Sequence, residues 1–248
     1  MFHSKKINSN LVYYSDLIPE LEHFFTTREF ILHSNNCNTD TQKLIDKNIN
    51  TVCAYLDIER ENFISPEQVH SAHIEFVKQK KSYPKTDALI LTDFIHAIYL
   101  NFADCVPVIL YDKHANIGGL AHAGRRGTAA EISVKTLKKM LDYTGSDLVD
   151  IYAVIGAAIS DCCYEVGKDV AEEIKNSVNN PNGFIKYKNN STYVDLKSIN
   201  AHQLIEAGLS PENIDICPFC TSCRNDLFFS YRKEHGTPNR HSAVIKLK

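Results

Sequence analysis

The fold is decided by residues 88–121, whose sequence is ALILTDFIHAIYLNFADCVPVILYDKHANIGGLA. Short apolar runs rich in β-branched and aromatic residues lie in this stretch, separated by turn residues such as those at 113–116. Runs of this kind are typical of buried strands. A similar run follows about thirty residues later. We therefore predict strands at Ala88–Leu91, Ala97–Asn101, Val106–Tyr111, Ile117–Ala121 and Ile151–Ile155.

Helical spacing surrounds these strands. Between Glu131 and Tyr143, apolar residues such as Leu137 and Met140 recur on one side of a helix. Closely spaced strands with helices between them favour the α+β class, a mixed α/β sandwich of mixed β-sheets with flanking helices, over a strictly alternating parallel sheet. Residues 178–193 are rich in Asn and predict a loop with a short hairpin. Further helices are predicted around Lys43–Leu56, Asp169–Val178 and Leu196–Ala207.

Length and composition limit the organisation of the chain. At 248 residues and 44% apolar content the chain can build a sizeable core. The polar segments at 34–46 and 178–193 have neither the length nor the composition of a linker. We therefore predict a single domain over residues 1–248.

Charge and hydropathy argue against two classes of partner. The net charge is −3, with mixed signs along the chain, so neither nucleic acid nor a membrane surface is an expected partner. The basic cluster of Lys78, Lys80 and Lys81 is short and is typical of solvated surface. The longest apolar runs are about seven residues, whereas a spanning helix needs about 20. With no visible signal peptide, we expect a cytoplasmic protein.

Three reactive residues lie beside predicted strand ends. His70 closes a turn-like stretch, Cys105 lies between two strands, and His122 ends a strand before a glycine-containing turn. Two imidazoles and a thiolate suit a catalytic zinc ion with one open position, or a cysteine nucleophile with a histidine base. The spacings of 35 and 17 residues match no local metal motif. Buried, chemically inert side chains therefore remain an alternative.

Five other cysteines form two clusters. Cys217, Cys220 and Cys223 are regularly spaced, but no fourth ligand follows locally. The adjacent pair Cys162 and Cys163 lies too close in sequence to supply two useful ligands by itself. We predict a structural or incidental role for all five cysteines.

Six segments, in order along the chain, carry a resemblance to one family. They are His23–Arg28, Gln68–His70, Ala103–Val108, His122–Gly127, Cys162–Gly167, and Cys220–Thr221 with Phe228–Arg232. Together they resemble the bacterial laccase-domain or "polyphenol oxidase" proteins, which are regarded as multifunctional purine nucleoside phosphorylases.

The resemblance implies a site and an activity. In that family one cysteine and two histidines bind the metal, which maps the ligands onto Cys105, His70 and His122. It implies an α/β sandwich related to cysteine hydrolases, and small-molecule nucleosides and phosphate as substrates. The implied reactions are phosphorolysis of adenosine, inosine and methylthioadenosine, and deamination of adenosine. We expect Zn²⁺ as the cofactor, with Cu²⁺ as a second choice.

Other residues receive predicted roles around this site. We expect Arg28 to hold phosphate, because a guanidinium suits its oxygens, with a surface ion pair as the alternative, and Gln68 to form a hydrogen bond with substrate. Asp104 is a candidate to orient a ligand histidine, with a capping or turn role as the alternative. Arg232 is expected to be structural.

Three other functions stay open. A metal-free cysteine hydrolase or amidase, of the type that edits peptidoglycan precursors, would use Cys105 with His122 as base. Copper-dependent phenol oxidation needs His-x-His pairs, which the sequence lacks. The family commonly has glycine at Ser71, threonine at Phe102 and tryptophan at Arg125. The departures at Phe102 and Arg125 suggest an inactive partner-binding scaffold as the third function, and the departures together leave the preferred nucleoside open.

Overall fold

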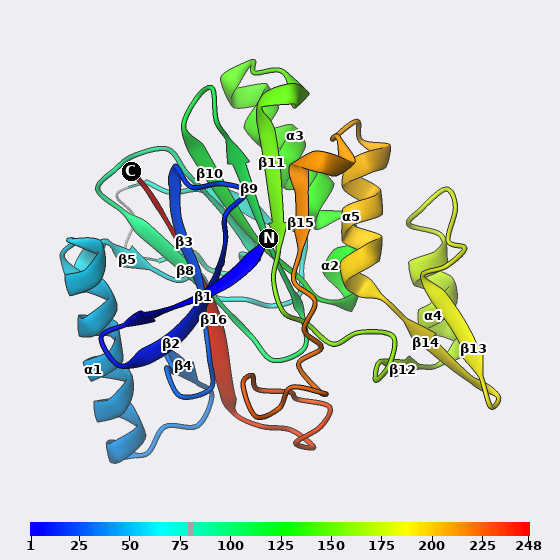
Figure 1. Cartoon of the computed structure of the whole chain (residues 1–248), viewed down its shortest axis with the longest axis horizontal. Helices are drawn as coiled ribbons and strands as arrows, with labels where there is room; N and C mark the ends of the chain where they lie inside the picture. The colour runs from blue at the N-terminus through cyan, green and yellow to red at the C-terminus, as the bar shows by residue number, and fades with distance from the viewer. Residues whose placement is uncertain (79–81) are drawn as a thin grey trace.

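The computed structural model describes residues 1–78 and 82–248, and in it two β-sheets pack face to face (Figure 1). Among these residues the first sheet has seven strands in the order β1-β2-β3-β16-β8-β5, with β4 also paired to β16. Its strands are β1 (Phe2–Ile7), β2 (Asn10–Ser15), β3 (Leu21–Thr26), β4 (His33–Ser34), β5 (Phe63–Ile64), β8 (Ala97–Phe102) and β16 (Asn239–Leu247). The first and last strands of the chain thus share one sheet.

The second sheet carries most of the predicted strands. It has six strands in the order β15-β11-β9-β10-β7-β6 among the described residues. They are β6 (Ile74–Phe76), β7 (Ala88–Leu91), β9 (Val106–Asp112), β10 (Ile117–Ala123), β11 (Ile151–Ile155) and β15 (Ile214–Ile216). Parallel and antiparallel pairs both occur: β6 runs parallel to β7, whereas β9 and β10 are antiparallel. The predicted mixed-sheet α+β class is confirmed.

Alternation along the strands explains why the second sheet is apolar on both faces. In β7, Leu89 and Leu91 point into the core between the two sheets, and Ala88 and Ile90 point to the opposite core. Successive side chains of a strand point to opposite faces, so a strand that is covered on both sides needs an unbroken apolar run. The runs that the sequence shows in residues 88–121 are therefore what a doubly covered sheet requires.

Helices cover the outer face of each sheet, with α1 on one side of the molecule and α3 and α5 on the other (Figure 1). Helix α1 (Thr39–Leu56) packs on the seven-stranded sheet, and its N-cap Asn38 accepts a hydrogen bond from Thr41 N at 2.8 Å. Helices α3 (Ile132–Thr144) and α5 (Leu196–Glu206) pack on the six-stranded sheet. The remaining helices are α2 (Arg125–Ala129), α4 (Lys168–Lys175) and the short 3₁₀ helices η1 (Arg60–Asn62), η2 (Leu148–Asp150) and η3 (Pro211–Asn213).

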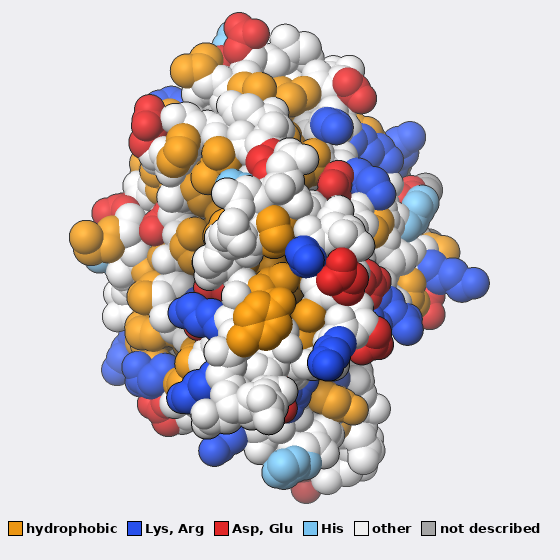
Figure 2. Space-filling model, turned by 90° about the vertical axis from the view of Figure 1, so that its right-hand side faces the viewer, with side chains coloured by type: hydrophobic (Ala, Val, Ile, Leu, Met, Phe, Trp, Pro, Cys, Tyr) orange, Lys and Arg blue, Asp and Glu red, His pale blue; other side chains and the backbone are white. Residues whose placement is uncertain are grey.

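A small three-stranded sheet projects beside α4 (Figure 1). It contains β12 (Glu165–Val166), β13 (Ile185–Lys188) and β14 (Ser191–Val194), and the β13–β14 hairpin falls at the loop predicted for residues 178–193. On this side of the molecule, basic side chains are interspersed with acidic ones (Figure 2).

The predicted elements agree closely with the observed ones where the chain is buried. Strands β7 and β11 have the predicted bounds, and α3, α4 and α5 differ from prediction by a few residues. Helix α1 begins four residues earlier than predicted, because Asn38 caps it. The predicted surface lysines at 80 and 81 lie outside the described residues. In the described part of the chain, no helix has the length and apolar composition needed to cross a membrane.

Candidate metal centre and cavity

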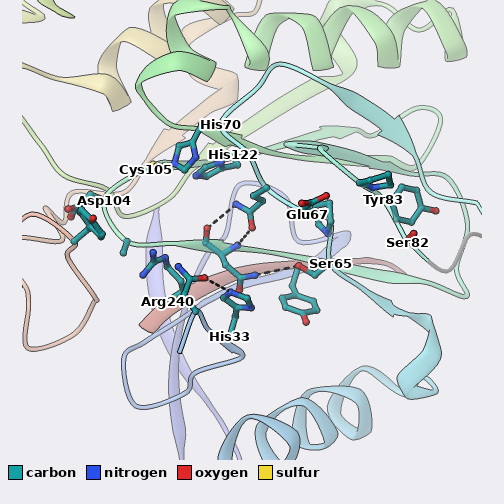
Figure 3. A pocket seen from close by; sticks show the side chains of 18 of the residues that line it. His33, Ser65, Glu67, His70, Ser82, Tyr83, Asp104, Cys105, His122 and Arg240 are labelled. Carbon is teal, nitrogen blue, oxygen red and sulfur yellow. Dashed lines mark hydrogen bonds between the residues drawn. The ribbon is translucent and has the colours of Figure 1, made fainter. Parts of the chain in front are cut away.

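The fold brings together the three side chains that the sequence singled out. His70 lies in the loop before β6, Cys105 lies between β8 and β9, and His122 lies near the end of β10. Their ligand atoms are all within 4.8 Å of one another, and Cys105 Sγ is 3.8 Å from His70 Nε2. The two imidazole rings meet edge to face with centroids 4.8 Å apart. Figure 3 shows the three side chains gathered at one end of a cavity.

Backbone geometry makes this convergence possible. His70 adopts a φ of 62° and Asp104, next to Cys105, a φ of 88°, so both loops turn sharply at the site. Gly124 lies against the ligands: a Cβ atom there would stand 2.9 Å from Cys105 Sγ and 3.0 Å from His70 Cδ2. A glycine is therefore required at this position if the three ligands are to approach one another.

Asp87, which the sequence analysis did not single out, binds two of the three candidate ligands. Its fully buried carboxylate accepts a hydrogen bond from His122 Nδ1 at 2.9 Å and from His70 N at 3.0 Å. It also accepts hydrogen bonds from Val69 N, Ser71 N and Ser71 Oγ. The bond to Nδ1 leaves His122 Nε2 as the ligand atom, which is the arrangement that fixes a metal-binding histidine. The sequence feature that could have identified Asp87 is its position directly before β7, a strand that is buried on both faces.

The charges of Cys105, His122 and Asp87 shift one another's pKa values. Burial alone would raise the pKa of Cys105, but the charge of His122 and hydrogen bonds from both histidines lower it to about 6. Burial alone would lower the pKa of His122, yet Cys105 and Asp87 raise it to about 9. For Asp87, burial opposes ionisation, but the bonds from His122 and Ser71 hold its pKa well below the ordinary value. Cys105 is therefore a thiolate near neutral pH, as a metal ligand or a nucleophile must be.

The donor set fits a metal ion. It combines one thiolate with two imidazoles, and the site is asymmetrically exposed: His122 is buried, Cys105 is partly exposed and His70 is exposed. Three protein ligands with one open side are the pattern of a catalytic zinc site. Among residues 1–78 and 82–248, only one other group of three or more His, Cys, Asp or Glu side chains is close enough to share an ion, and it contains no histidine.

A cavity of about 980 Å³ opens from the exposed side of the centre. Aromatic rings and two arginines contribute to its wall. Arg240 is half-buried, and its Nη1 donates to Thr237 O at 2.6 Å and to Asn239 O at 2.8 Å. The lining residues used below are Glu67, Tyr99, Tyr164, Tyr231, Arg232 and Arg240.

The two residues predicted to bind substrate are placed differently. Gln68 lines the cavity, but its amide bonds the backbone of Asn101 at both ends, at 2.9 Å and 3.0 Å. Arg28 is not among the lining residues. Its guanidinium lies over the Phe229 ring at 4.9 Å and 3.6 Å from a Glu234 carboxylate oxygen. Binding of phosphate by Arg28 stays a prediction, and this placement gives it no support.

Asp104 links two segments of the cavity wall through hydrogen bonds. Its carboxylate accepts hydrogen bonds from Thr221 Oγ1 at 2.6 Å and from Arg232 N at 2.7 Å. Asp104 therefore does not orient a histidine; Asp87 accepts the hydrogen bond from His122 Nδ1 instead. Arg232 is anchored as expected, donating to Glu165 O at 2.8 Å and lying over the Tyr164 ring.

The departures from the family pattern have local structural effects. The Phe102 ring packs against the His122 ring, with the two ring centroids 5.3 Å apart. The Ser71 hydroxyl gives Asp87 an additional donor that a glycine could not supply. Arg125 forms an ion pair with Glu173 on α4.

Comparisons with known proteins agree with the resemblance. The sequence model of the multi-copper polyphenol oxidoreductase laccase family matches residues 22–248. The chain is 32% identical over 234 residues to the purine nucleoside phosphorylase YlmD of Geobacillus stearothermophilus, covering 89% of this chain and 84% of that protein. It is 30% identical over 207 residues to the adenosine deaminase RL5 of an unknown prokaryotic organism, covering 78% of each.

A solved structure extends the comparison to the fold. The crystal structure of YlmD from Geobacillus stearothermophilus superposes with a TM-score of 0.88 at 27% identity, covering 99% of this chain and 98% of that one. Family motif, fold and relatives thus agree, and the chain belongs to the multi-copper polyphenol oxidoreductase laccase family.

Proposed function

We propose that this chain is a metal-dependent purine nucleoside enzyme that phosphorolyses adenosine, inosine and methylthioadenosine and deaminates adenosine. Relatives named purine nucleoside phosphorylase and adenosine deaminase support nucleoside processing in general. The observation that carries the proposal is the His70–Cys105–His122 group at the end of a large cavity with arginines in its wall. We further propose that residues 1–248 act as one domain, since β1 and β16 share a sheet.

His70, Cys105 and His122 would hold the metal, which we propose to be zinc, with copper as the second choice because imidazole and thiolate suit both. A bound zinc ion supplies a Lewis acid at this end of the cavity. Asp87 keeps His122 in one tautomer and fixes the loop of His70, so that the ligands need no rearrangement. All eight cysteines are free thiols, as expected in a reducing cytoplasm, and we propose a cytoplasmic location.

The cavity wall provides what the substrates need. In phosphorolysis, a phosphate oxygen bonds to C1′ of the ribose while the bond from C1′ to the purine breaks, giving ribose 1-phosphate and free base. The Arg240 guanidinium, held by two carbonyl oxygens, would bind the phosphate. The rings of Tyr99, Tyr164 and Tyr231 offer faces for a purine, and the Glu67 carboxylate offers acceptors for ribose hydroxyls.

The test is an assay of the purified, metal-loaded protein with each nucleoside. We expect phosphate-dependent release of free base, and release of ammonia from adenosine. The Cys105→Ser variant should lose both, and the matched variant Cys37→Ser, an exposed cysteine outside the site, should keep both. A folded protein that carries the metal but releases neither product would refute the proposal.

The second candidate is the metal-free cysteine hydrolase or amidase. The lowered pKa of Cys105 and the Cys105–His122–Asp87 series of contacts favour it. The two candidates differ in their inhibitors. Alkylation of Cys105 should abolish either activity, but a chelator should abolish only the metal-dependent one.

A further inference from the structure

Four cysteines outside this site lie together. They are Cys162, Cys163, Cys220 and Cys223, and their sulfur atoms are all within 4.8 Å of one another. Two pairs, Cys162 with Cys223 and Cys163 with Cys223, have sulfurs 3.5 Å apart. Cys217, which the sequence groups with Cys220 and Cys223, is buried in a separate apolar cluster. The local segment therefore supplies two sulfurs, Cys220 and Cys223, and the distant segment at Cys162 and Cys163 supplies the other two.

The backbone explains how adjacent cysteines can both take part. Residues 161–163 form a turn, closed by hydrogen bonds from Cys163 N and Tyr164 N to Ser160 O at 2.9 Å. In an extended strand Cys162 and Cys163 would point to opposite faces, but a turn can present both on one side. The expectation that Cys162 and Cys163 lie too close in sequence to supply two ligands did not take this turn into account.

The arrangement has the size of a four-sulfur metal site. Zn–S bonds of about 2.3 Å in a tetrahedron place the sulfurs about 3.8 Å apart, whereas a disulfide needs about 2.05 Å. The two separations of 3.5 Å lie close to the first value, and the other sulfur pairs are within 4.8 Å. The segment Cys220-Thr-Ser-Cys223 has the two-residue spacing that recurs in such sites.

The sulfur of Cys220 has the surroundings of a bound thiolate. It is buried and accepts a backbone hydrogen bond from Ser160 N at 3.4 Å. Hydrogen bonds of this kind to ligand sulfurs stabilise the negative charge that metal binding requires.

We propose that Cys162, Cys163, Cys220 and Cys223 bind one structural zinc ion, at a second metal site separate from the His70–Cys105–His122 centre. Four protein ligands close the coordination shell, so this site has no open position for substrate. The ion would join the segment after β11 to the segment after β15, which otherwise meet at the Ala158–Cys220 bridge.

The four-cysteine site lies next to residues that form the cavity wall. Cys163 directly precedes Tyr164, which lines the cavity, and Thr221 bonds the Asp104 carboxylate beside Cys105. Arg232 N bonds the same carboxylate. The zinc ion would therefore hold one wall of the cavity in place.

The experiment measures zinc in protein that lacks the first site. Cys105→Ala, purified under reducing conditions, is expected to retain one zinc per chain. Adding Cys223→Ser should remove that ion, and adding Cys37→Ser, which alters an exposed cysteine outside both groups, should not. Nucleoside turnover does not enter this measurement, so failure of the proposed function would leave its outcome intact.

Cobalt substitution identifies the ligands. Co²⁺ added to metal-free Cys105→Ala should give strong thiolate-to-cobalt charge-transfer absorption in the near ultraviolet. Cys223→His keeps a ligand at the exposed position, so it should retain one ion with a weaker band, even if Cys223→Ser fails to fold. Reduced Cys105→Ala that takes up neither Zn²⁺ nor Co²⁺, or that contains disulfides among the four cysteines, would overturn the proposal.

Discussion

Replacing Asp87 with asparagine should weaken metal binding at the His70–Cys105–His122 centre. Oδ1 accepts from His70 N and His122 Nδ1, while Oδ2 accepts from Val69 N, Ser71 N and Ser71 Oγ. An amide has one acceptor oxygen, so in either orientation its NH₂ group faces at least two donors.

The magnitude follows from those lost acceptors. A fully buried donor left without a partner costs about 1–3 kcal/mol, and because only the bond from His122 is buried and the others are half-buried, the free energy of unfolding should fall by up to about 6 kcal/mol. Loss of a group that orients a ligand histidine typically weakens metal binding roughly 10–100-fold. Asp87→Asn should therefore show both effects, with the larger change in affinity if the NH₂ group faces His122.

Two measurements check this prediction. Competition with a chromophoric chelator gives the zinc dissociation constant, and urea unfolding of the metal-free protein gives stability. Asp93→Asn is a matched control, because the Asp93 carboxylate accepts from Ile95 N, His96 N and His96 Nδ1 but is partly exposed and outside the centre. An unchanged zinc dissociation constant in Asp87→Asn would show that Asp87 does not position the ligands.

Three further outcomes are expected. Gly124→Ala should push Cys105 and His70 apart and weaken zinc binding at least about tenfold by the same titration, with an unchanged circular dichroism spectrum. Dialysis against a strong chelator should abolish phosphate-dependent base release, and zinc should restore it; activity that survives complete metal removal contradicts the metal-dependent mechanism. Burial lowers the pKa of His23 to about 4. Because the unfolded chain takes up this proton near pH 6.5, stability should fall by up to about 3 kcal/mol as the pH drops from about 6.5 to 4. The decrease in urea midpoint over that range should be smaller in His23→Gln, and an equal decrease would exclude His23 as a source.

The sequence predicted the long apolar strands of the second sheet well and the strands of mixed polar and apolar composition poorly. Strand β7 is covered on both faces, so its apolar run is continuous and its bounds are evident. Strand β1 is mostly exposed and mixes polar with apolar residues, and β16 begins with polar residues. The apolar run of β16 is only three residues long, Ala243–Ile245, and β1 has none, so neither strand was predicted.

The site shows the same division. His70, Cys105 and His122 were recognisable because their residue types are chemically distinctive, and a family resemblance grouped them. Asp87 was missed because its importance comes from donors that converge only in three dimensions. The pairing of Cys162 and Cys163 with a distant CxxC segment likewise depends on a turn that no local spacing reveals.

The central position of β16 has a consequence for synthesis on the ribosome. This strand joins β3 to β8, so until residues 239–247 have emerged, the nascent chain holds two separate groups of strands with open hydrogen-bonding edges. More than half of the polypeptide, from residue 103 to β16, must therefore be translated before the sheet that contains β3 and β8 can be completed. Slow elongation over that interval would prolong the exposure of those edges to pairing with other chains.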